Sequence, residues 1–348
     1  MTVDYRPAWA EVDLDALRHN VAEVRAAARG AEVCAVVKAD AYGHGSVPVA
    51  RAALEAGATW LAVALVEEGV VLREAGILAP VLLLSEPPAA AAAEVVARDL
   101  TPTVYTAGAV RALAGAAAAA GRQVGVHVKV DTGMHRVGAD EATAVEVARA
   151  VEASGALRLD GVWTHLAAAD DPEQGDYTAE QCRRFSDVRG RLAAEGVRPR
   201  VVHLANSAGA LMVGARHDLV RAGLAIYGYH PNPRCPSRAD LRPVLSLEAR
   251  VSHVKRLAAG ERVSYGLRYA LPADAVVATV PLGYADGVPR RLFETGGRVL
   301  VGGALRPIAG VVTMDQLMVD CGPDADVHPG DEVVLIGRQG HLSVTADD

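Results

Sequence analysis

The feature that most constrains the fold of this 348-residue chain is an alternation of short apolar runs with helix-forming segments, repeated eight times before about residue 223. The runs are rich in β-branched residues and apolar almost throughout, a pattern typical of parallel strands covered on both faces. They span residues 33–37, 60–65, 81–84, 101–105, 124–130, 159–163, 201–204 and 219–221. We therefore expect parallel strands at the centre of this part of the chain.

The segments between the runs have the composition and spacing of helices. They are rich in Ala, Glu and Arg at 46–57, 107–120, 140–154 and 176–196. Ahead of the first run, apolar residues recur in steps of three and four and predict an amphipathic helix; they are Leu14, Leu17, Val21 and Val24. Eight strands alternating with helices predict a (β/α)8 barrel. An open, doubly wound sheet is the alternative, but it usually has fewer strands, and no GxGxxG loop follows any run.

The pattern changes near Pro231-Asn232-Pro233, a turn-rich break. Beyond it, Gly and Pro separate short alternating runs at 245–254, 275–280, 298–301, 316–319 and 332–336. This is typical of a compact, mostly antiparallel β domain. The sequence thus predicts an α/β protein with a (β/α)8 TIM-like barrel over residues 1–235 and a β domain over residues 236–348.

Composition limits the classes of function. With 35 basic and 42 acidic residues the chain carries a formal net charge of −7, whereas a general nucleic-acid binder needs a basic face. No segment approaches the roughly 18 uninterrupted apolar residues of a membrane span, and the charged N-terminus is unlike a signal peptide. Four scattered cysteines without CxxC spacing indicate reduced thiols. We therefore expect a cytoplasmic protein that binds neither nucleic acid nor membranes.

In a barrel of this kind the functional site lies at the C-terminal ends of the strands, and charged and polar residues occupy those positions here. They are Lys38, Lys129, Arg136, His165, Asn206, Ser207 and Arg221. Such an excess of cations suits a ligand with phosphate and carboxylate groups. Lys38 directly follows an apolar run, where a charge is costly unless it is paired or has lost its proton. A lysine with a lowered pKa is what Schiff-base chemistry requires. His203, within the seventh run, is interpreted as structural.

Each of these residues also has a structural interpretation. A lysine at a strand end is usually a solvated rim residue, and His165 alone is more typical of a hydrogen-bonded structural histidine. Arg136 and Arg221 alone could pair with the many acidic residues. A metal site of His165 with Asp170 and Asp171 is conceivable, although their spacing does not require one. The prediction therefore depends on the constellation and not on any single member.

The string AVVKADAYGHG at 35–45 resembles the cofactor attachment motif of the alanine racemases. Further matches follow in order over nearly the whole chain: VKVDTGMHRVG (128–138), THLAAAD (164–170), HLANSAG (203–209), VRAGLAIYG (220–228), VSYG (263–266), PLGYADG (281–287) and GVVTMDQLMVD (310–320). The resemblance implies a fold-type III pyridoxal-phosphate enzyme, an isomerase built of a barrel and a β domain. It also implies a head-to-tail homodimer with shared active sites.

The resemblance implies roles for individual residues. Lys38 would hold pyridoxal 5'-phosphate covalently and act as the base on one face of the alanine Cα, while Tyr265, reaching in from the second subunit, would act on the other face. His165 and Arg221 would assist Tyr265, and Arg221 would contact the pyridine nitrogen. Because arginine does not surrender its proton, that nitrogen would stay largely unprotonated, which favours reprotonation at Cα over transamination.

The remaining implied roles concern the substrate and the cofactor phosphate. Arg136 would bind the substrate carboxylate with help from the backbone amide of Met314 of the other subunit, and Tyr284 would narrow the substrate entrance. The implied cofactor contacts are Tyr42, Asn206, Ser207, Gly223, Leu224 and Tyr227. Lys129 matches a lysine that is carbamylated in some family members and buttresses Arg136. Racemisation of L- and D-alanine, with a role in peptidoglycan synthesis, is the function that we expect.

Family members usually continue past the point where this sequence ends, at Asp348, with a helix and a strand that include a tyrosine at the cofactor phosphate. Loss of that contact predicts a cofactor affinity lower by roughly ten- to a hundredfold. The alternatives are a non-catalytic pyridoxal-phosphate carrier, although carriers lack a second domain, and a racemase of broader specificity. A related decarboxylase is less consistent with Arg221, because those enzymes place an acidic residue at the pyridine nitrogen.

Overall fold

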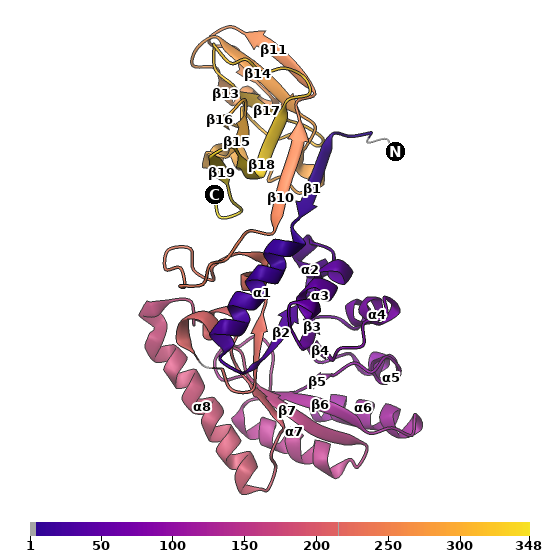
Figure 1. The fold of residues 1–348 in the computed structure, drawn as a ribbon. Helices are drawn as coiled ribbons and strands as arrows, with labels where there is room; N and C mark the ends of the chain where they lie inside the picture. Colours follow the sequence, from indigo (N-terminus) through magenta and orange to yellow (C-terminus); the bar gives the residue numbers. More distant parts are fainter. Residues whose placement is uncertain (1–4, 215) are drawn as a thin grey trace. The chain divides into compact units, whose positions relative to one another are not determined.

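The computed structural model describes residues 5–214 and 216–348, which form two compact units. The barrel unit is Leu14–Arg242, and the β unit combines residues 5–13 with Pro243–Asp348. The N-terminal segment belongs to the β unit because strand β1 (Ala8–Val12) pairs antiparallel with β10 (Leu245–Arg250), as Figure 1 shows. This differs from the expected division into 1–235 and 236–348, which assigned the first residues to the barrel.

The barrel unit contains the eight expected parallel strands. They are β2 (Glu32–Val36), β3 (Trp60–Val63), β4 (Val81–Leu83), β5 (Thr103–Val104), β6 (Val124–Lys129), β7 (Leu157–Trp163), β8 (Val201–His203) and β9 (Leu219–Ala222). Two four-stranded sheets have the orders β4-β3-β2-β9 and β5-β6-β7-β8. Backbone hydrogen bonds cross both seams, from Leu83 to Thr101 and from Asp218 to Val202. The predicted (β/α)8 barrel is thereby confirmed.

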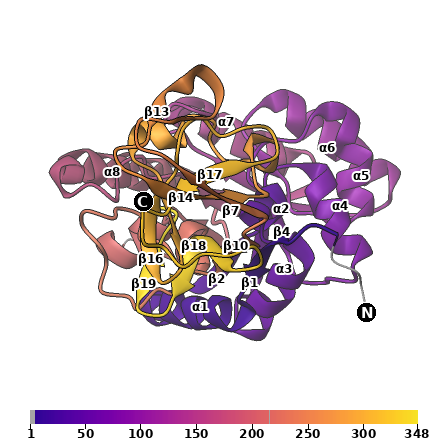
Figure 2. The ribbon, with the colours of Figure 1, turned by 90° about the horizontal axis from the view of Figure 1, so that it is seen from above.

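Helices follow one another around the outside of the strands (Figure 2). They are α1 (Leu14–Ala28), α3 (Ser46–Glu55), α4 (Val66–Glu74), α5 (Ala92–Ala97), α6 (Ala107–Ala119), α7 (Glu141–Ala153) and α8 (Gly175–Ala194), with shorter turns at Ala89–Ala91, Pro172–Gln174, Gly209–Val213 and Leu224–Tyr227. The segment labelled α2 (Lys38–Gly43) is a left-handed turn after β2. In α1, Leu17, Val21 and Val24 are fully buried, which confirms the predicted apolar face. None of the helices in the described ranges is both long and apolar enough to cross a lipid bilayer.

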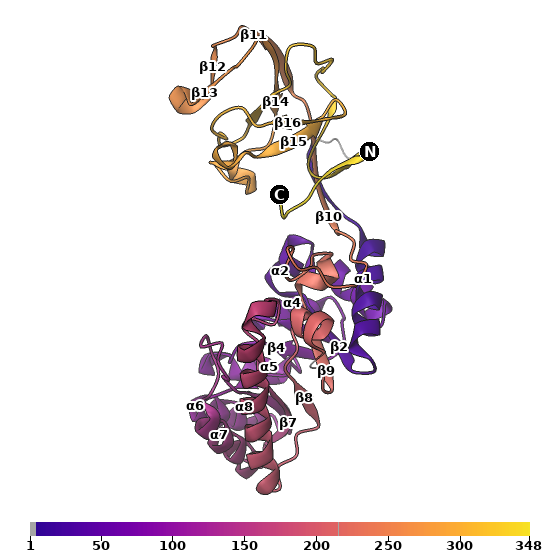
Figure 3. The same ribbon diagram turned by 90° about the vertical axis from the view of Figure 1, so that its left-hand side faces the viewer.

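The strands of the β unit pair antiparallel, as predicted. Besides β1 and β10 they are β11 (His253–Leu257), β12 (Arg262–Val263), β13 (Tyr269–Ala270), β14 (Ala275–Val280), β15 (Arg298–Val301), β16 (Ala304–Pro307), β17 (Leu317–Asp320), β18 (Glu332–Gln339) and β19 (Leu342–Val344). One sheet has the order β1-β10-β18-β15-β16, with β19 on β18; a second has the order β11-β14-β17, and β12 and β13 form a separate hairpin. This hairpin lies at one end of the unit (Figure 3). The shared apolar core includes Ala249, Val280, Val301 and Val333.

The sequence predicted one strand over residues 245–254, but the structure has two strands there. β10 ends at Arg250 in one sheet and β11 begins at His253 in another. Between them, the Val251 amide donates to Asp331 and the Ser252 amide donates to Thr279. The chain therefore crosses from one sheet to the other within an uninterrupted alternating pattern, which carries no signal of the break.

Candidate active site

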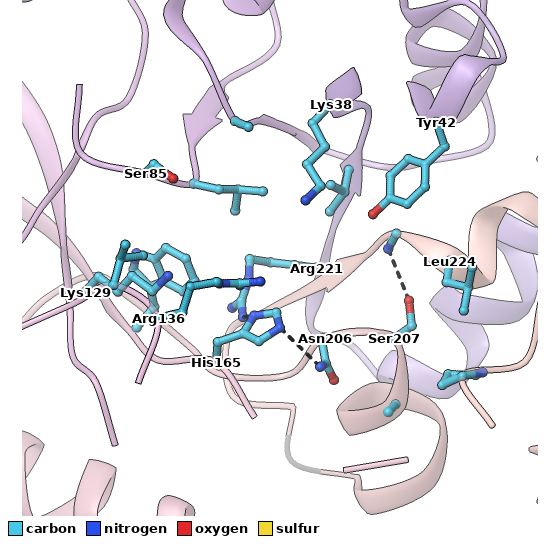
Figure 4. Close-up of a pocket in the computed structure, with 18 of the residues that line it drawn as sticks. Lys38, Tyr42, Ser85, Lys129, Arg136, His165, Asn206, Ser207, Arg221 and Leu224 are labelled. Carbon is cyan, nitrogen blue, oxygen red and sulfur yellow. Dashed lines mark hydrogen bonds between the residues drawn. The ribbon is translucent and has the colours of Figure 1, made fainter. Parts of the chain in front are cut away.

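A cavity of about 510 Å³ lies at the C-terminal ends of the barrel strands, a size usual for a cofactor or substrate site. It brings together all but one of the barrel residues that the sequence placed in the site, which are Lys38, Tyr42, Lys129, Arg136, His165, Asn206, Ser207, Arg221, Gly223 and Leu224. Figure 4 shows Lys38 and Tyr42 pointing into this cavity opposite Arg221 and His165. The exception is Tyr227, which is buried behind Tyr42 with its ring 4.7 Å away and donates a hydrogen bond to the carbonyl of Val36.

The segment that carries Lys38 and Tyr42 has an uncommon backbone. After β2 the chain makes a left-handed turn, with φ between 51° and 56° at each residue from Ala39 to Tyr42. An L-residue in this region costs roughly 1–2 kcal/mol, and only glycine adopts it freely. The turn is closed by hydrogen bonds from the Ala41 amide to Val37 and from the Ser46 amide to the Asp40 carboxylate. The sequence ADAY gives no indication of this conformation.

Arg221 is the central cation of the cavity. Only 3% of its surface is exposed, and its guanidinium donates to Nδ1 of His203 at 2.9 Å and to the carbonyl of Thr164 at 2.9 Å. It also lies over the Trp163 ring, 4.5 Å from the ring centroid. Burial lowers the pKa of Arg221 to about 10, so the group stays charged at neutral pH. Its acceptors are imidazole and carbonyl groups, and no acidic residue forms an ion pair with it among the described residues.

Two buried histidines continue from Arg221 into the barrel interior. Because an arginine can only donate, His203 must accept at Nδ1 and carry its proton on Nε2. That nitrogen lies 2.9 Å from Nδ1 of His127, so His203 donates there and the proton of His127 is on Nε2. Burial lowers the pKa of both imidazoles, which keeps them neutral. His203 was expected to be structural, and it is fully buried and hydrogen-bonded; its bond to Arg221 shows which residue of the site it supports.

His165 has a polar side chain near each of its two ring nitrogens. Arg221 approaches Nδ1 at 3.3 Å, and the Asn206 amide nitrogen lies 3.5 Å from Nε2. Burial, reinforced by the charges of Arg221 and Lys129, lowers the pKa of His165 to about 2. The imidazole is therefore neutral at any physiological pH, and since Arg221 can only donate, Nδ1 of His165 accepts and Nε2 carries the proton.

Lys129 is the buried lysine of the site. It is 3% exposed, and its ammonium lies over the Trp163 ring at 4.3 Å from the centroid. Burial and the nearby charges of Arg221 and Arg136 lower its pKa to about 7, so a large share of this amine is neutral at neutral pH. With Lys38, the cavity is lined by four cationic side chains against one carboxylate, that of Asp170. This excess of positive charge suits a ligand with several negative charges.

The opposite end of the cavity is lined by hydroxyl and backbone groups. Ser207 Oγ accepts hydrogen bonds from the amides of Gly223 at 3.1 Å and Ala225 at 3.3 Å. A Cβ at Gly223 would lie 2.6 Å from the Tyr42 hydroxyl, so only glycine lets that hydroxyl approach the backbone. The groups that meet here are small, polar and free of negative charge, which fits the phosphate of a cofactor.

Three predicted residues lie in the β unit, and all three are exposed. Tyr265 is 68% exposed, Met314 53% and Tyr284 39%. One residue, Ser264, separates Tyr265 from the end of β12, and it has a left-handed φ of 67°.

Hydrogen bonds join the segments that carry these three residues. The Ser264 hydroxyl donates to the carbonyl of Val311, which connects the Tyr265 turn to the loop before Met314. The amides of Tyr284 and Ala285 donate to the Thr313 and Met314 carbonyls at 3.0 Å each. Three residues that are far apart in the sequence therefore belong to one hydrogen-bonded group of turns.

The metal alternative finds no support. Within residues 5–214 and 216–348, no three His, Cys, Asp or Glu side chains gather in a way that could hold a metal ion. Of the three residues considered, His165 and Asp170 line the cavity and Asp171 does not; its side chain instead caps the turn at Pro172–Gln174.

Comparisons with known proteins agree with this site. Residues 12–231 match the family described as "Alanine racemase, N-terminal domain", and residues 244–348 match "Alanine racemase, C-terminal domain". The alanine racemase of Symbiobacterium thermophilum is 45% identical over 344 residues, which cover 99% of this chain and 91% of that protein.

Solved structures show the same relationship. The alanine racemase of Bacillus anthracis with bound L-Ala-P superposes with a TM-score of 0.91 at 39% identity, covering 98% of this chain and 88% of that one. A histidine racemase of Leuconostoc mesenteroides has a TM-score of 0.90 at 32% identity, covering 99% and 92%. Both family matches and this level of identity over almost the full chain place the protein in one group: it is an isomerase that belongs to the alanine racemase family.

Proposed function

We propose that the protein racemises alanine with pyridoxal 5'-phosphate as its cofactor, through Lys38 and Tyr265 as two bases, in a homodimer. The family assignment supports the reaction. The observation that carries the cofactor and site assignments is the cavity itself, where four basic side chains, a neutral imidazole and a glycine-dependent polar end converge. We further propose that the enzyme works in the cytoplasm and supplies D-alanine for peptidoglycan.

The cavity residues suit the phosphate, the aldehyde carbon and the pyridine nitrogen of this cofactor in turn. Tyr42, Ser207 and the backbone at Gly223 and Leu224 would hold the phosphate, with Asn206 beside them and Tyr227 supporting Tyr42. Lys38 would form the covalent link, and Arg221 would donate to the pyridine nitrogen. When bound, pyridoxal phosphate withdraws electrons from the Cα of an attached amino acid and acidifies its proton. Since Arg221 keeps its proton at neutral pH, it limits this withdrawal and favours return of a proton to Cα.

Racemisation needs a proton removed from one face of Cα and delivered to the other. The Lys38 amine would serve one face. The Tyr265 hydroxyl, exposed on its own chain, would serve the other face from a second copy of the protein. The neutral His165, at the wall of the cavity, would donate a hydrogen bond from Nε2 to the oxygen of that tyrosine and help to hold it. Because one base would come from each chain, this proposal makes dimerisation a requirement for catalysis.

Substrate selection follows from charge and space. Arg136 would bind the alanine carboxylate together with the Met314 amide, and Tyr284 would narrow the entrance. The neutral Lys129 amine would add to carbon dioxide and release a proton, and the resulting carbamate would pair with Arg136. Its lowered pKa of about 7 and its place beside Arg136 in the cavity lining support this modification.

The decisive experiment measures the optical activity of L-alanine by circular dichroism, with purified protein and added pyridoxal phosphate. Decay of the signal that is lost in Lys38→Ala supports the proposal. Cofactor absorbance without decay would instead support the non-catalytic carrier.

The histidine racemase among the structural neighbours makes a second substrate worth testing. In the same assay L-histidine should be racemised far more slowly than L-alanine if two tyrosines restrict the pocket. Comparable rates would support a racemase of broader specificity.

A further inference from the structure

The left-handed turn that presents Lys38 and Tyr42 is built without glycine at four successive positions, Ala39 to Tyr42. Each of these residues is held in a conformation that an isolated chain would leave. Something outside the turn must therefore stabilise it. The aromatic rings of Tyr227 and Tyr42 pack at its C-terminal end, where the ring centroids are 4.7 Å apart.

At the N-terminal end of the turn, the stabilising group is the carboxylate of Glu68. Its Oε1 accepts a hydrogen bond from the Ala39 amide at 2.6 Å. Its Oε2 accepts from the amides of Ala64 and Leu65, at 2.8 and 3.0 Å. Glu68 lies in the first turn of α4. Its Oε2 therefore accepts from the backbone just ahead of its own helix, and its Oε1 reaches the loop that follows β2.

The two loops that Glu68 joins leave adjacent parallel strands, since β2 pairs with β3. A carboxylate that accepts three backbone N–H groups is a strong, directional connection. One of these hydrogen bonds comes from the amide of Ala39, the residue that immediately follows Lys38. Rotation of the Ala39 peptide out of the left-handed region would change the direction of both neighbouring side chains.

From this geometry we propose that Glu68 is a positioning residue for the cofactor site: its carboxylate fixes the left-handed turn, and through it the directions of the Lys38 amine and the Tyr42 hydroxyl. The inference rests on the proposed function of Lys38 as the cofactor attachment point. Glu68 touches no substrate in this scheme and acts only through the backbone of the turn.

The first test compares Glu68→Gln with Glu67→Gln in the full-length protein. Glu67 is the exposed neighbour on the same helix, and its side chain forms no hydrogen bond within the described ranges. In Glu68→Gln an amide NH2 replaces one accepting oxygen and faces backbone donors. We expect the dissociation constant for pyridoxal phosphate, from the absorbance of the lysine-bound cofactor, to rise about tenfold or more, with no change in Glu67→Gln.

A second variant separates positioning from a general loss of stability. Ala39 is exposed, and glycine adopts its φ of 51° and ψ of 50° without strain. Ala39→Gly in the Glu68→Gln background should recover about threefold or more of the lost affinity. It cannot restore the bonds at Ala64 and Leu65, so recovery identifies the turn as the element on which Glu68 acts.

Hydrogen exchange of the cofactor-free protein gives a readout independent of activity. Peptides covering residues 38–45 should exchange about tenfold faster in Glu68→Gln than in Glu67→Gln. Equal affinity and equal exchange in the two variants would overturn the inference, as would a loss of affinity that Ala39→Gly leaves unchanged. If the unmodified protein forms no lysine-bound cofactor, the proposed function fails first, and the exchange result still decides whether Glu68 holds the turn.

Discussion

The guanidinium of Arg221 donates a hydrogen bond to Nδ1 of His203, at 2.9 Å in the closed interior of the barrel. His203 in turn donates to His127, and its ring stacks on Trp163 with an interplanar angle of 10°. Arg221, the proposed partner of the pyridine nitrogen, is thus held by neutral aromatic side chains, and no carboxylate neutralises its positive charge among the described residues.

His203→Phe tests this relationship. Phenylalanine keeps the stacked ring but leaves both a donor of Arg221 and the acceptor of His127 without a partner in a buried site. We expect the free energy of unfolding in urea to fall by about 1–3 kcal/mol. His253→Phe, at an exposed imidazole in β11, serves as control and should change stability by less than about 0.5 kcal/mol. Equal stability of both variants would contradict the assigned role of His203.

Much of this architecture could be predicted, because each barrel strand is apolar on both faces and the chemistry of such barrels sits at their C-terminal ends. That Lys38, Arg136, His165 and Arg221 meet in one cavity could be predicted from their places at or after strand ends, whereas their individual roles are implied only by the resemblance. The hairpin and edge strands of the β unit could not be predicted. β12 and β13 are two residues long, and β1 pairs with β10, which lies far along the chain.

The features of the site that the sequence did not reveal have physical causes too. Local propensity gives no sign of four left-handed residues in ADAY, because tertiary bonds such as that of Glu68 impose them. The role of His203 depends on strand register, which sets Trp163 of β7 opposite His203 of β8. The sequence also gave no sign that Lys129 is 3% exposed and that burial lowers its pKa to about 7, because this depends on how the barrel packs around it.

The pKa of Lys129 predicts a pH dependence of stability. Its value of about 7 in the folded protein lies below the ordinary 10.5, so the unfolded chain binds more protons between these two values. Stability should therefore rise with pH across this window, by up to about 1 kcal/mol per pH unit, and be flat below it. Urea unfolding at pH 7 and pH 9, in buffer free of carbon dioxide, should show this gain in the unmodified protein and not in Lys129→Met. Parallel changes in the two proteins would contradict the assignment.

The same amine should be the site of carbamylation. Protein equilibrated with carbon-13-labelled bicarbonate should give a carbamate resonance that disappears in Lys129→Met. Lys255→Met is the matched control, because Lys255 lies in β11 of the other unit and outside the cavity. A resonance that persists in Lys129→Met would assign the modification elsewhere.

Gly223→Ala should weaken cofactor binding. The new Cβ would lie 2.6 Å from the Tyr42 hydroxyl and displace it from the end of the cavity that we assign to the phosphate. We expect the dissociation constant for pyridoxal phosphate to rise roughly tenfold. Gly190→Ala, in the middle of α8 with open space around it, should leave binding unchanged and slightly stabilise the helix.

A double-mutant comparison identifies the cause of that loss. In a Tyr42→Phe background the hydroxyl that the added methyl group would meet is gone, so Gly223→Ala should cost less affinity there than in the unmodified protein. Strictly additive losses would mean that Gly223→Ala acts through its own backbone and not through Tyr42.

Subunit mixing tests whether Lys38 and Tyr265 come from different chains. Lys38→Ala and Tyr265→Ala should each be nearly inactive alone, because each removes one of the two proposed bases from every site. Mixed by unfolding and refolding together, half of the dimers would be hybrids. In each hybrid one site would contain an intact Lys38 and an intact Tyr265, and the other site neither.

Random mixing should therefore restore about a quarter of the specific activity of the unmodified enzyme. If both bases came from the same chain, every site in every dimer would lack one of them, and mixing would restore nothing. Sedimentation of the mixture shows whether dimers formed, so an inactive mixture of dimers would count against the shared site, and activity in a monomeric fraction would count against the dimer itself.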